Sequence, residues 1–326
     1  MQCNYCERRC KITDGQTGFC RMYTASGDVI CERFPHRWSS CASSVIESIP
    51  FYHVYPGSRC LAIGTTGCNF RCRYCSNSYF AKEDPEIQQD RLYTLSPRKL
   101  VSMAQKLNCR SIVFNINEPT VSIPSLLEVA GEARTAGIPM GCLTNAYTTQ
   151  GATELLASIF SFFNISLKGL SNYFNKMYIG IESAKPVLRN IQQLAKVRHV
   201  EVTTPIIQGA NDSEIDSIAD FLTEVDPEIP WHVFRLLPED EMIDAEYPNI
   251  QSIDAALQSA RKKLPYIYFH NFVGSEWVNT LCPNCGSVVV ERFSLGCGGD
   301  KLNRLHCEDN RCPSCGRAIK MVSKEN

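Results

Sequence analysis

GTTGCNFRCRYCSN, residues 64–77, places Cys68, Cys72 and Cys75 in a C-x3-C-x2-C spacing directly after an apolar run. Three thiolates this close in sequence, behind a glycine-containing turn and without a fourth cysteine or a histidine beside them, are typical of a cubane iron–sulfur cluster. One iron of such a cluster has no protein ligand, whereas a zinc knuckle requires a fourth ligand. We therefore expect an open iron that binds a substrate or a cofactor.

The residues around this motif alternate apolar runs with amphipathic stretches, which predicts β-α units around a parallel sheet. Helices are expected after Ser96-Pro97, after Asn211-Asp212 and after Ser252, because apolar residues recur there with a helical period behind a capping residue. The predicted fold class is α/β, with six strands in a partial (β/α)6 barrel. These strands are expected at residues 60–64, 111–116, 139–144, 162–167, 199–207 and 231–237.

The composition limits the possible partners. The 326-residue chain is 44% hydrophobic and 21% charged with a formal net charge of −1, which is typical of a globular protein without an electrostatic preference for nucleic acid. No run of about 18 apolar residues is present to span a membrane. The N-terminal MQCNYCERRC lacks the apolar stretch of a secretory signal, so a cytoplasmic protein is predicted. In a reducing compartment, 18 cysteines indicate metal sites rather than disulfides.

The central motif resembles that of the radical S-adenosylmethionine (SAM) superfamily, in which C-x3-C-x-aromatic-C holds a 4Fe-4S cluster, and Tyr74 matches the aromatic position. The resemblance implies that SAM chelates the open iron through its amino and carboxylate groups. An electron from the cluster would then cleave SAM to methionine and a 5′-deoxyadenosyl radical, with the protein supplying ligation and orientation. It also implies that the site gathers at the carboxyl ends of the barrel strands.

Further stretches at predicted strand ends extend this resemblance. The NINEPT stretch occupies the place of the family's Gly-Gly-Glu-Pro motif, which receives the SAM amino group, although its first two positions differ. Ser166-Leu167-Lys168 stands where glycyl-radical activases have Asp-x-Lys, and Ser166 lacks the carboxylate. The turn at Gly209 resembles one that packs against adenine. The residues implied to bind SAM or flank the cluster are Tyr74, Asn117, Glu118, Pro119, Thr120, Thr144, Asn145, Ser166 and Gly209.

Three cationic or titratable residues are candidate catalytic residues: Lys168, His232 and Arg235. His232 and Arg235 belong to the sixth predicted strand, and strict alternation would direct them to opposite faces. Each could reach substrate or only complete the mouth of the barrel.

The N-terminal cysteine group consists of Cys3, Cys6, Cys10 and Cys20 in a C-x2-C-x3-C-x9-C spacing. Four cysteines suit either tetrahedral zinc or a second iron–sulfur cluster, and the spacing does not choose between them. The charges around Cys3 and Cys6 resemble a small exposed knuckle, which favours zinc. Solvent-exposed free thiols are the remaining alternative.

The C-terminal cysteine group consists of two C-P-x-C-G knuckles, Cys282/Cys285 and Cys312/Cys315. Paired knuckles of this type predict a zinc ribbon or a rubredoxin-like iron site. The spacing from Cys307 to Cys315 also resembles that of plant ferredoxins. We expect one zinc or iron ion on the two knuckles, with Cys297 and Cys307 either free or on the substrate side.

The cysteine distribution predicts three regions: an N-terminal cysteine-rich module over residues 1–57, a radical SAM core over 58–275, and a C-terminal zinc-ribbon or rubredoxin-like module over 276–326. The combination resembles the AmmeMemoRadiSam-system radical SAM enzymes, relatives of pyruvate formate-lyase activating enzyme. That resemblance implies an oxygen-sensitive oxidoreductase that takes hydrogen from a protein or peptide and receives electrons from a reductant such as ferredoxin or flavodoxin. The alternatives are rearrangement, coupling or methylation of a small metabolite, and a non-catalytic iron–sulfur redox sensor or scaffold.

Overall fold

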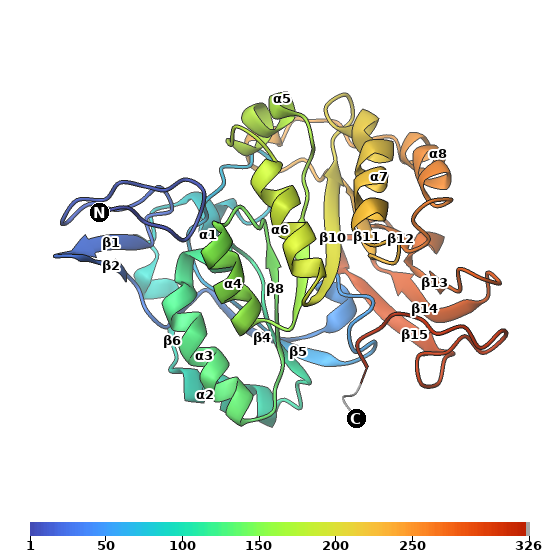
Figure 1. The fold of residues 1–326 in the computed structure, drawn as a ribbon, viewed down its shortest axis with the longest axis horizontal. Coiled ribbons are helices and arrows are strands. Elements are labelled where there is room, and N and C mark those ends of the chain that lie inside the picture. Colours follow the sequence, from blue (N-terminus) through green and yellow to red (C-terminus); the bar gives the residue numbers. More distant parts are fainter. Residues whose placement is uncertain (324–326) are drawn as a thin grey trace.

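Eight strands form the central sheet of the computed structural model, which describes residues 1–323 (Figure 1). Seven of them are parallel neighbours in chain order, and β4 pairs antiparallel with β5 at one edge. These strands are β4 (Ser40–Val45), β5 (Arg59–Gly64), β7 (Ser111–Phe114), β8 (Met140–Thr144), β9 (Phe162–Ser166), β10 (His199–Ile206), β11 (Trp231–Arg235) and β12 (Ile267–His270).

All six predicted strands are present in the predicted order, and the α/β class is confirmed. The structure adds β4 and β12, one at each edge of the sheet. The sequence SCASSV of β4 has no continuous apolar run, and the apolar part of β12 is only three residues long. Neither stretch therefore shows the long buried run that marks central parallel strands.

Helices connect the parallel strands and pack along one side of the sheet (Figure 1). The predicted cap of α2 is confirmed, because Ser96 accepts a hydrogen bond from the Lys99 amide and Pro97 opens the helix. Neighbouring helices contact one another in chain order from α2 to α8, with α5 outside this row. The helices are α1 (Ser78–Lys82), α2 (Pro97–Lys106), α3 (Ile123–Thr135), α4 (Gln150–Ile159), α5 (Asn172–Phe174), α6 (Lys185–Ala195), α7 (Ile215–Val225) and α8 (Ile250–Ala260).

Two smaller cysteine-rich parts flank the central sheet on opposite sides in Figure 1. The N-terminal part contains the antiparallel hairpin β1 (Tyr23–Ser26) and β2 (Val29–Glu32). The C-terminal part is a three-stranded antiparallel sheet of β13 (Thr280–Leu281), β14 (Val288–Ser294) and β15 (Asp300–Leu305). A short pair joins β3 (Arg37–Trp38) to β6 (Tyr93–Thr94). The exact domain boundaries given above remain predictions.

Short helical turns complete the structure between these elements. The turn at Pro119–Ser122 contains two of the predicted cofactor residues, Pro119 and Thr120. The 3-10 turns are Ile46–Ser48, Gln89–Arg91, Pro119–Ser122, Asp212–Glu214, Asp240–Met242, Glu276–Val278 and Gly296–Gly298, and a π-helical turn spans Asn175–Ile179.

Within residues 1–323, no helix combines the length and the apolar character needed to cross a membrane.

Candidate active site and metal centres

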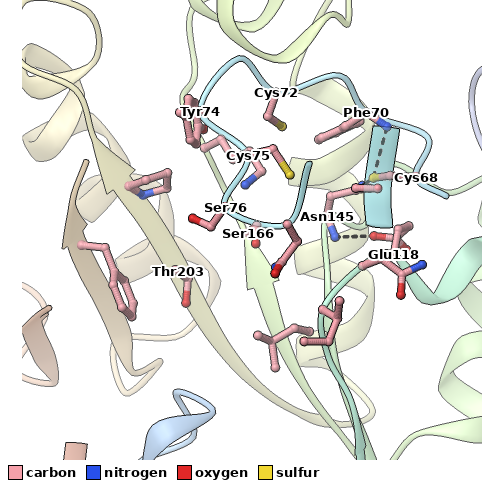
Figure 2. Close-up of a pocket in the computed structure, with 18 of the residues that line it drawn as sticks. Cys68, Phe70, Cys72, Tyr74, Cys75, Ser76, Glu118, Asn145, Ser166 and Thr203 are labelled. Carbon is pink, nitrogen blue, oxygen red and sulfur yellow. Dashed lines mark hydrogen bonds between the residues drawn. The ribbon is translucent and has the colours of Figure 1, made fainter. Parts of the chain in front are cut away.

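A cavity of about 410 Å³ opens at the carboxyl ends of the parallel strands (Figure 2). Parallel α/β folds place their chemistry at this end, because the loops that follow successive strands meet there. Among the residues that line the cavity are Cys68, Tyr74, Asn117, Glu118, Thr144, Asn145, Ser166, Lys168 and Arg235, so most of the predicted site residues are brought together.

The three cysteines of the central motif lie on the loop that follows β5 and line this cavity (Figure 2). Burial raises the pKa of Cys68, Cys72 and Cys75, and at Cys68 the nearby Glu118 carboxylate raises it further. A buried thiol of this kind becomes a thiolate when a metal cation compensates for the lost hydration. The three cysteines therefore suit metal ligation rather than service as free nucleophiles.

Asn117 and Gly67 fix the path of the cysteine loop. The Asn117 side-chain amide donates to the backbone carbonyls of Thr66 and Gly67 at 3.0 and 2.8 Å. Gly67 has a φ of 78°, and a Cβ at this position would lie 2.6 Å from the Met22 side chain and 2.8 Å from the Cys20 carbonyl. Only glycine fits both the conformation and the space. Asn117 thus holds the loop in addition to lining the cavity.

Glu118 is a buried carboxylate surrounded by hydrogen-bond donors. It accepts from the Thr120 amide at 3.1 Å, the Thr120 hydroxyl at 2.5 Å, the Thr144 hydroxyl at 2.8 Å and the Asn145 amide at 2.7 Å. Burial raises the pKa of Glu118, and these hydrogen bonds oppose the shift. No lysine, arginine or histidine among residues 1–323 forms an ion pair with it. A carboxylate buried without a counter-cation is suited to receive a cationic ligand.

Lys168, Tyr74 and Asn145 surround the cysteines from three different loops. The Lys168 ammonium lies 5.6 Å from the centre of the Tyr74 ring, and the Tyr74 hydroxyl is buried without a hydrogen-bond partner in the described residues. The Asn145 side-chain amide donates to the Asn69 side chain at 2.7 Å and lies 3.8 Å from the Cys68 sulfur. Ser166, at the end of β9, also lines the cavity. Cations and amide donors therefore face the place where a negatively charged cluster would lie.

Arg235 lines the cavity from the end of β11. Its backbone amide and carbonyl are held by the Asn271 side chain, at 3.2 and 2.8 Å, and its guanidinium lies 4.7 Å from the centre of the Tyr247 ring. In the described part of the chain, no carboxylate pairs with this guanidinium. Arg235 is therefore available to an anionic group in the cavity.

His232 does not line the cavity; it is fully buried beside His270, whose ring stacks on the cavity-lining Phe234. Its Nε2 lies 2.6 Å from Glu201 and its Nδ1 lies 2.8 Å from Nε2 of His270, whose Nδ1 lies 2.5 Å from Asp300. Glu201 also accepts from the backbone amides of Tyr52 and His53, and Asp300 accepts from the Tyr52 hydroxyl. Burial lowers the pKa of His270 to about 4. The structure gives His232 a place in the interior rather than at the substrate.

Gly209, Pro119 and Thr120 also lie outside the cavity lining. Gly209 has a φ of 74°, and its amide donates to the Asp212 carboxylate at 3.0 Å, as expected for the predicted turn. Thr120 acts on Glu118 through the hydrogen bonds given above. Pro119 opens the short helical turn that follows Glu118. Contacts of these three residues with a cofactor remain predictions.

Several cavity residues were not predicted. Asn164 and Thr203 are polar residues within the buried strands β9 and β10, and the Thr203 hydroxyl donates to the Asn164 side chain at 2.6 Å. A polar residue inside an apolar strand is a signal that could have indicated them. Phe234 and Asn271 carry no such signal. Ile116 also lines the cavity and has a φ of 75°, which the sequence does not indicate.

The four C-terminal cysteines converge as predicted. The sulfurs of Cys282, Cys285, Cys312 and Cys315 all lie within 4.8 Å of one another, and the pairs Cys282/Cys315 and Cys285/Cys312 lie 3.6 Å apart. Tetrahedral zinc with Zn–S bonds of about 2.3 Å requires sulfurs about 3.8 Å apart. Hydrogen bonds from Asn284 and the Arg317 amide lower the pKa of Cys315 to about 6. The group fits a single tetrahedral ion.

Cys297 and Cys307 lie outside both the C-terminal quartet and the large cavity. Cys297 is exposed, and Cys307 is buried in the apolar cluster of the C-terminal part. Placement on the substrate side, one of the two predicted alternatives, is therefore wrong for both residues. The ferredoxin-like use of Cys307 also receives no support from these positions.

The N-terminal cysteine group lines a second, small cavity between the N-terminal part and the cysteine loop. The expectation of a small exposed knuckle is wrong, because Cys3 and Cys6 are only 6% and 9% exposed and Cys3 packs with Ile12 and Tyr23. Apolar side chains of the hairpin and of residues 5–19 cover the sulfurs. The observation that favoured zinc over an iron–sulfur cluster is thereby removed.

Comparison with known proteins agrees with the geometry of the large cavity. The model of the radical SAM superfamily matches residues 62–222. The chain belongs to the radical SAM superfamily. An uncharacterised protein of Methanocaldococcus jannaschii is 30% identical to this radical SAM protein over 328 residues, which cover 99% of this chain and 96% of the relative. A putative glycyl-radical enzyme activating enzyme of the same organism is 25% identical over 232 residues, covering 69% of this chain and 86% of the relative.

Among solved structures, this radical SAM chain is similar to SuiB of Streptococcus suis bound to its precursor peptide SuiA, with 13% identity and a TM-score of 0.49. The match covers 67% of this chain and 48% of SuiB. A domain of pyruvate-formate lyase-activating enzyme from Bacteroides vulgatus has 18% identity and a TM-score of 0.40, covering 49% of this chain and 98% of the domain.

The radical SAM fold implies a 4Fe-4S cluster and SAM as cofactors. The residues present fit both groups. Three cysteines face one cavity, which leaves one iron of a cubane without a protein ligand. Glu118 has no cationic partner within residues 1–323 and suits the SAM amino group. Lys168 and Arg235 have no carboxylate partner within the same residues and suit anionic groups.

Proposed function

We propose that this radical SAM enzyme removes a hydrogen atom from a protein or peptide substrate. The observation that carries the proposal is one cavity lined by Cys68, Cys72, Cys75 and the unpaired Glu118 carboxylate. When bound, the cluster supplies one electron that cleaves SAM to methionine and a 5′-deoxyadenosyl radical, which takes the hydrogen. The electron comes from a cytoplasmic one-electron reductant such as ferredoxin or flavodoxin.

The residues of the chain bind and orient these groups. Cys68, Cys72 and Cys75 ligate the cluster. Glu118, held by its donors, receives the SAM amino group, and the cation of Lys168 compensates for the negative charge near Cys72 and Cys75. The positive charge of Lys168 favours the thiolate forms of Cys72 and Cys75. Asn145 donates toward Cys68 and to the Asn69 side chain, which holds the cysteine loop in place.

Arg235 has a different role in this proposal. It lies at the end of β11 without a carboxylate partner in the described residues, in the same cavity as the cysteines. A guanidinium presents several donors in a fixed plane and recognises carboxylates and backbone carbonyls. We assign Arg235 to the substrate and not to the cofactor.

Two features favour a macromolecular substrate. Apolar side chains are exposed on the loops after β9 and β11: Tyr173, Met177, Ile243 and Tyr247 are 47% to 72% exposed. Both loops contact the cysteine loop. The backbone amide of Arg73 donates a hydrogen bond to the Tyr178 carbonyl, and the Arg73 guanidinium forms an ion pair with Glu241. Exposed apolar side chains around a cavity are typical of protein interaction sites. The relationship to a putative glycyl-radical enzyme activating enzyme points to the same substrate class.

Deuterium transfer identifies the substrate class directly. Extract from cells of the source organism grown in heavy water is separated into a macromolecular fraction and a small-molecule filtrate. Each is incubated anaerobically with reconstituted enzyme, unlabelled SAM and dithionite, and 5′-deoxyadenosine is analysed by mass spectrometry. The proposal predicts a gain of one mass unit with the macromolecular fraction, and loss of this gain after the fraction is digested with protease.

The same experiment distinguishes the alternatives. Deuterium transfer from the filtrate alone would contradict a protein or peptide substrate and favour a small metabolite. A Cys72→Ala variant, which lacks one ligand, controls for 5′-deoxyadenosine that does not depend on the cluster. If the native enzyme releases no more than this variant, the chain is better described as a redox sensor or scaffold.

A further inference from the structure

The small cavity of the N-terminal cysteine group has the composition of a closed metal site. All four sulfur-bearing residues line it, together with the apolar side chains of Tyr5, Phe19 and Tyr23. Cys3 and Cys6 are buried, and Cys10 and Cys20 are half-buried. Apolar residues would pack around such a cavity as well as neutral thiols do, whereas a metal centre uses all four cysteines as thiolate ligands.

The spacing of these sulfurs differs from that of the C-terminal quartet, which serves as an internal reference for a single ion. In the quartet, sulfur pairs lie 3.6 Å apart and all four sulfurs lie within 4.8 Å of one another. In residues 1–323, the N-terminal group shows no sulfur–sulfur contact of this kind, and its four residues surround a cavity instead. A single ion draws its ligands together, while a cluster, whose irons and sulfides occupy the centre, holds them apart.

Asn69 provides an independent indication of a ligand in this cavity. Its side chain is 1% exposed and lines the cavity, and its Nδ2 has no hydrogen-bond partner other than the Cys6 sulfur among the described residues. The Oδ1 atom of the same side chain accepts from Asn145 at 2.7 Å, which fixes its orientation. A buried amide donor beside a neutral thiol is poorly satisfied unless a bound group supplies a stronger, anionic acceptor. Sulfides and thiolates of an iron–sulfur cluster are such acceptors.

Backbone and cationic groups complete the surroundings. The Phe19 amide donates to the Cys10 sulfur at 3.3 Å. The guanidinium groups of Arg8 and Arg71 lie over the Phe19 ring at 3.6 and 4.7 Å from its centre. Arg71 is close enough to both Cys20 and Cys68 to interact electrostatically with each thiolate. Positive charge thus lies between the two cysteine groups, where it offsets the negative charge of a centre on either side.

We propose that the N-terminal cysteine group binds an iron–sulfur cluster, separated from the catalytic cavity by Asn69 and Arg71. All four ligands come from the protein, so this cluster has no open iron for SAM and differs in kind from the one at Cys68. Since Asn69 directly follows Cys68 in the chain and lines the N-terminal cavity, the second centre lies next to the first. Its position suits a one-electron relay from an external reductant to the catalytic cluster.

The test uses the full chain with the catalytic cysteines removed, in the triple variant Cys68→Ala, Cys72→Ala and Cys75→Ala. The protein is reconstituted anaerobically with ferrous iron and sulfide and desalted, and its iron, acid-labile sulfide, zinc and absorption near 400 nm are measured. We expect two or four sulfides per chain with at least as many irons. One zinc at the N-terminal group without sulfide, or no bound sulfide at all, would overturn the proposal.

Matched cysteine variants locate the cluster. Adding Cys6→Ala and Cys20→Ala to the triple variant is expected to abolish the sulfide and the absorption near 400 nm. Adding Cys31→Ala, at a cysteine of the same part of the chain that does not line the cavity, is expected to preserve both. Retention of one ion by the C-terminal quartet in every variant shows that the chain has folded. Sulfide that persists in the Cys6/Cys20 variant would place the cluster elsewhere and contradict the proposal.

This experiment is independent of the proposed function. It contains no SAM and measures no turnover, and it uses a protein that lacks the catalytic ligands. If the native enzyme forms no 5′-deoxyadenosine, the proposed function fails, but the result expected for iron and sulfide in the triple variant stays the same.

Discussion

Ile116 shows how a single residue maintains an unfavourable backbone next to the site. It follows β7 with a φ of 75°, a value that glycine adopts readily and that is a rare exception for a β-branched residue. Across from it, a Cβ on Gly64 would lie 2.9 Å from the Ile116 Cβ. Strained residues of this kind persist where the surrounding structure fixes them, commonly at functional sites.

Replacing Ile116 separates backbone strain from side-chain contacts. Ile116→Ala and Ile116→Gly remove nearly the same side chain, but alanine keeps a Cβ at positive φ. The Gly variant is therefore expected to be more stable than the Ala variant by about 1 kcal/mol. Urea unfolding of the two variants measures this difference. Equal stabilities would show that the backbone at this position is not strained.

Glu118 permits a matched test of cofactor recognition. Glu118→Gln keeps the shape of the side chain and removes its charge, so a cationic amino group loses a charged hydrogen bond of about 1.5–3 kcal/mol. SAM affinity is expected to fall by at least about tenfold, while the iron content stays unchanged. Equilibrium binding of SAM to the reconstituted protein measures the change. Glu132→Gln on α3, at an exposed position, is the control, and equal affinities for the two variants would exclude the assigned role.

At the scale of elements, the contact between β8 and β9 depends on a glycine. Gly141 pairs with Phe162, and a Cβ on Gly141 would lie 1.9 Å from the Phe162 ring. That ring is fully buried and packs edge-on against Phe51 at 4.9 Å. The close approach of these two strands brings Thr144 and Ser166 to the same cavity.

Gly141→Ala is expected to destabilise the protein by about 3 kcal/mol, because a buried ring and two paired strands must move to admit one methyl group. Gly131→Ala on α3 is the matched change without a clash, since no atom lies within 4 Å of the added Cβ. It should stabilise the protein by about 0.5–1 kcal/mol through helix propensity. Denaturant unfolding of both variants tests the pair. Similar effects of the two substitutions would contradict the packing described for β8 and β9.

The sequence predicted the elements whose signals are local and missed those that depend on partners. The six central strands and the cap of α2 follow from apolar periodicity and a capping residue. The predicted cap of α7 is wrong, because that helix begins after Glu214 without a side-chain cap, and Asn211 and Asp212 accept from Ile207 and Gly209 instead. The cysteine loop was found from its C-x3-C-x2-C spacing, and Glu118 from the resemblance of NINEPT to the Gly-Gly-Glu-Pro motif. The edge strand β4 is stabilised by its pairing with β5, and Asn271 enters the cavity only because β12 joins the sheet. His232 was misplaced toward the substrate because depth along a strand is set by tertiary packing.

At the scale of the whole molecule, residues 320–322 pack against residues 53–55, far from them in the sequence. His53 is fully buried there, with its Nδ1 at 2.7 Å from the Lys320 carbonyl and its Nε2 at 2.6 Å from the Tyr268 hydroxyl. A carbonyl only accepts, so Nδ1 carries the hydrogen and Nε2 accepts from Tyr268. His53 is therefore held neutral, and burial lowers its pKa to about 3.

This burial predicts a pH dependence with a definite sign. The unfolded chain takes up a proton at His53 below about pH 6.5, and the folded protein does so only near its lowered pKa, so stability falls as the pH decreases through this interval. His53→Gln removes this contribution, which amounts to about 1.4 kcal/mol between pH 7.5 and 5.5. Urea unfolding of both proteins at the two pH values measures it, with absorption near 400 nm confirming intact clusters. An identical pH dependence in the variant would refute the neutral, buried state of His53.

The three parts of the chain contribute to one catalytic cavity in different ways. The central sheet positions the proposed cluster ligands and Glu118, and the N-terminal part packs against Asn69 and Arg71 of the cysteine loop. The C-terminal part contributes Asp300 to the buried histidine chain beneath the cavity. Radical chemistry at Cys68, Cys72 and Cys75 is the claim on which this assembly depends.

Formation of 5′-deoxyadenosine tests that claim most directly. Protein reconstituted anaerobically is incubated with SAM and dithionite, and 5′-deoxyadenosine and methionine are quantified beside the Cys72→Ala and Cys31→Ala variants. We predict equal amounts of the two products from the native protein and from Cys31→Ala, and none above background from Cys72→Ala. Native protein with a full iron and sulfide content that forms no more 5′-deoxyadenosine than Cys72→Ala would contradict it.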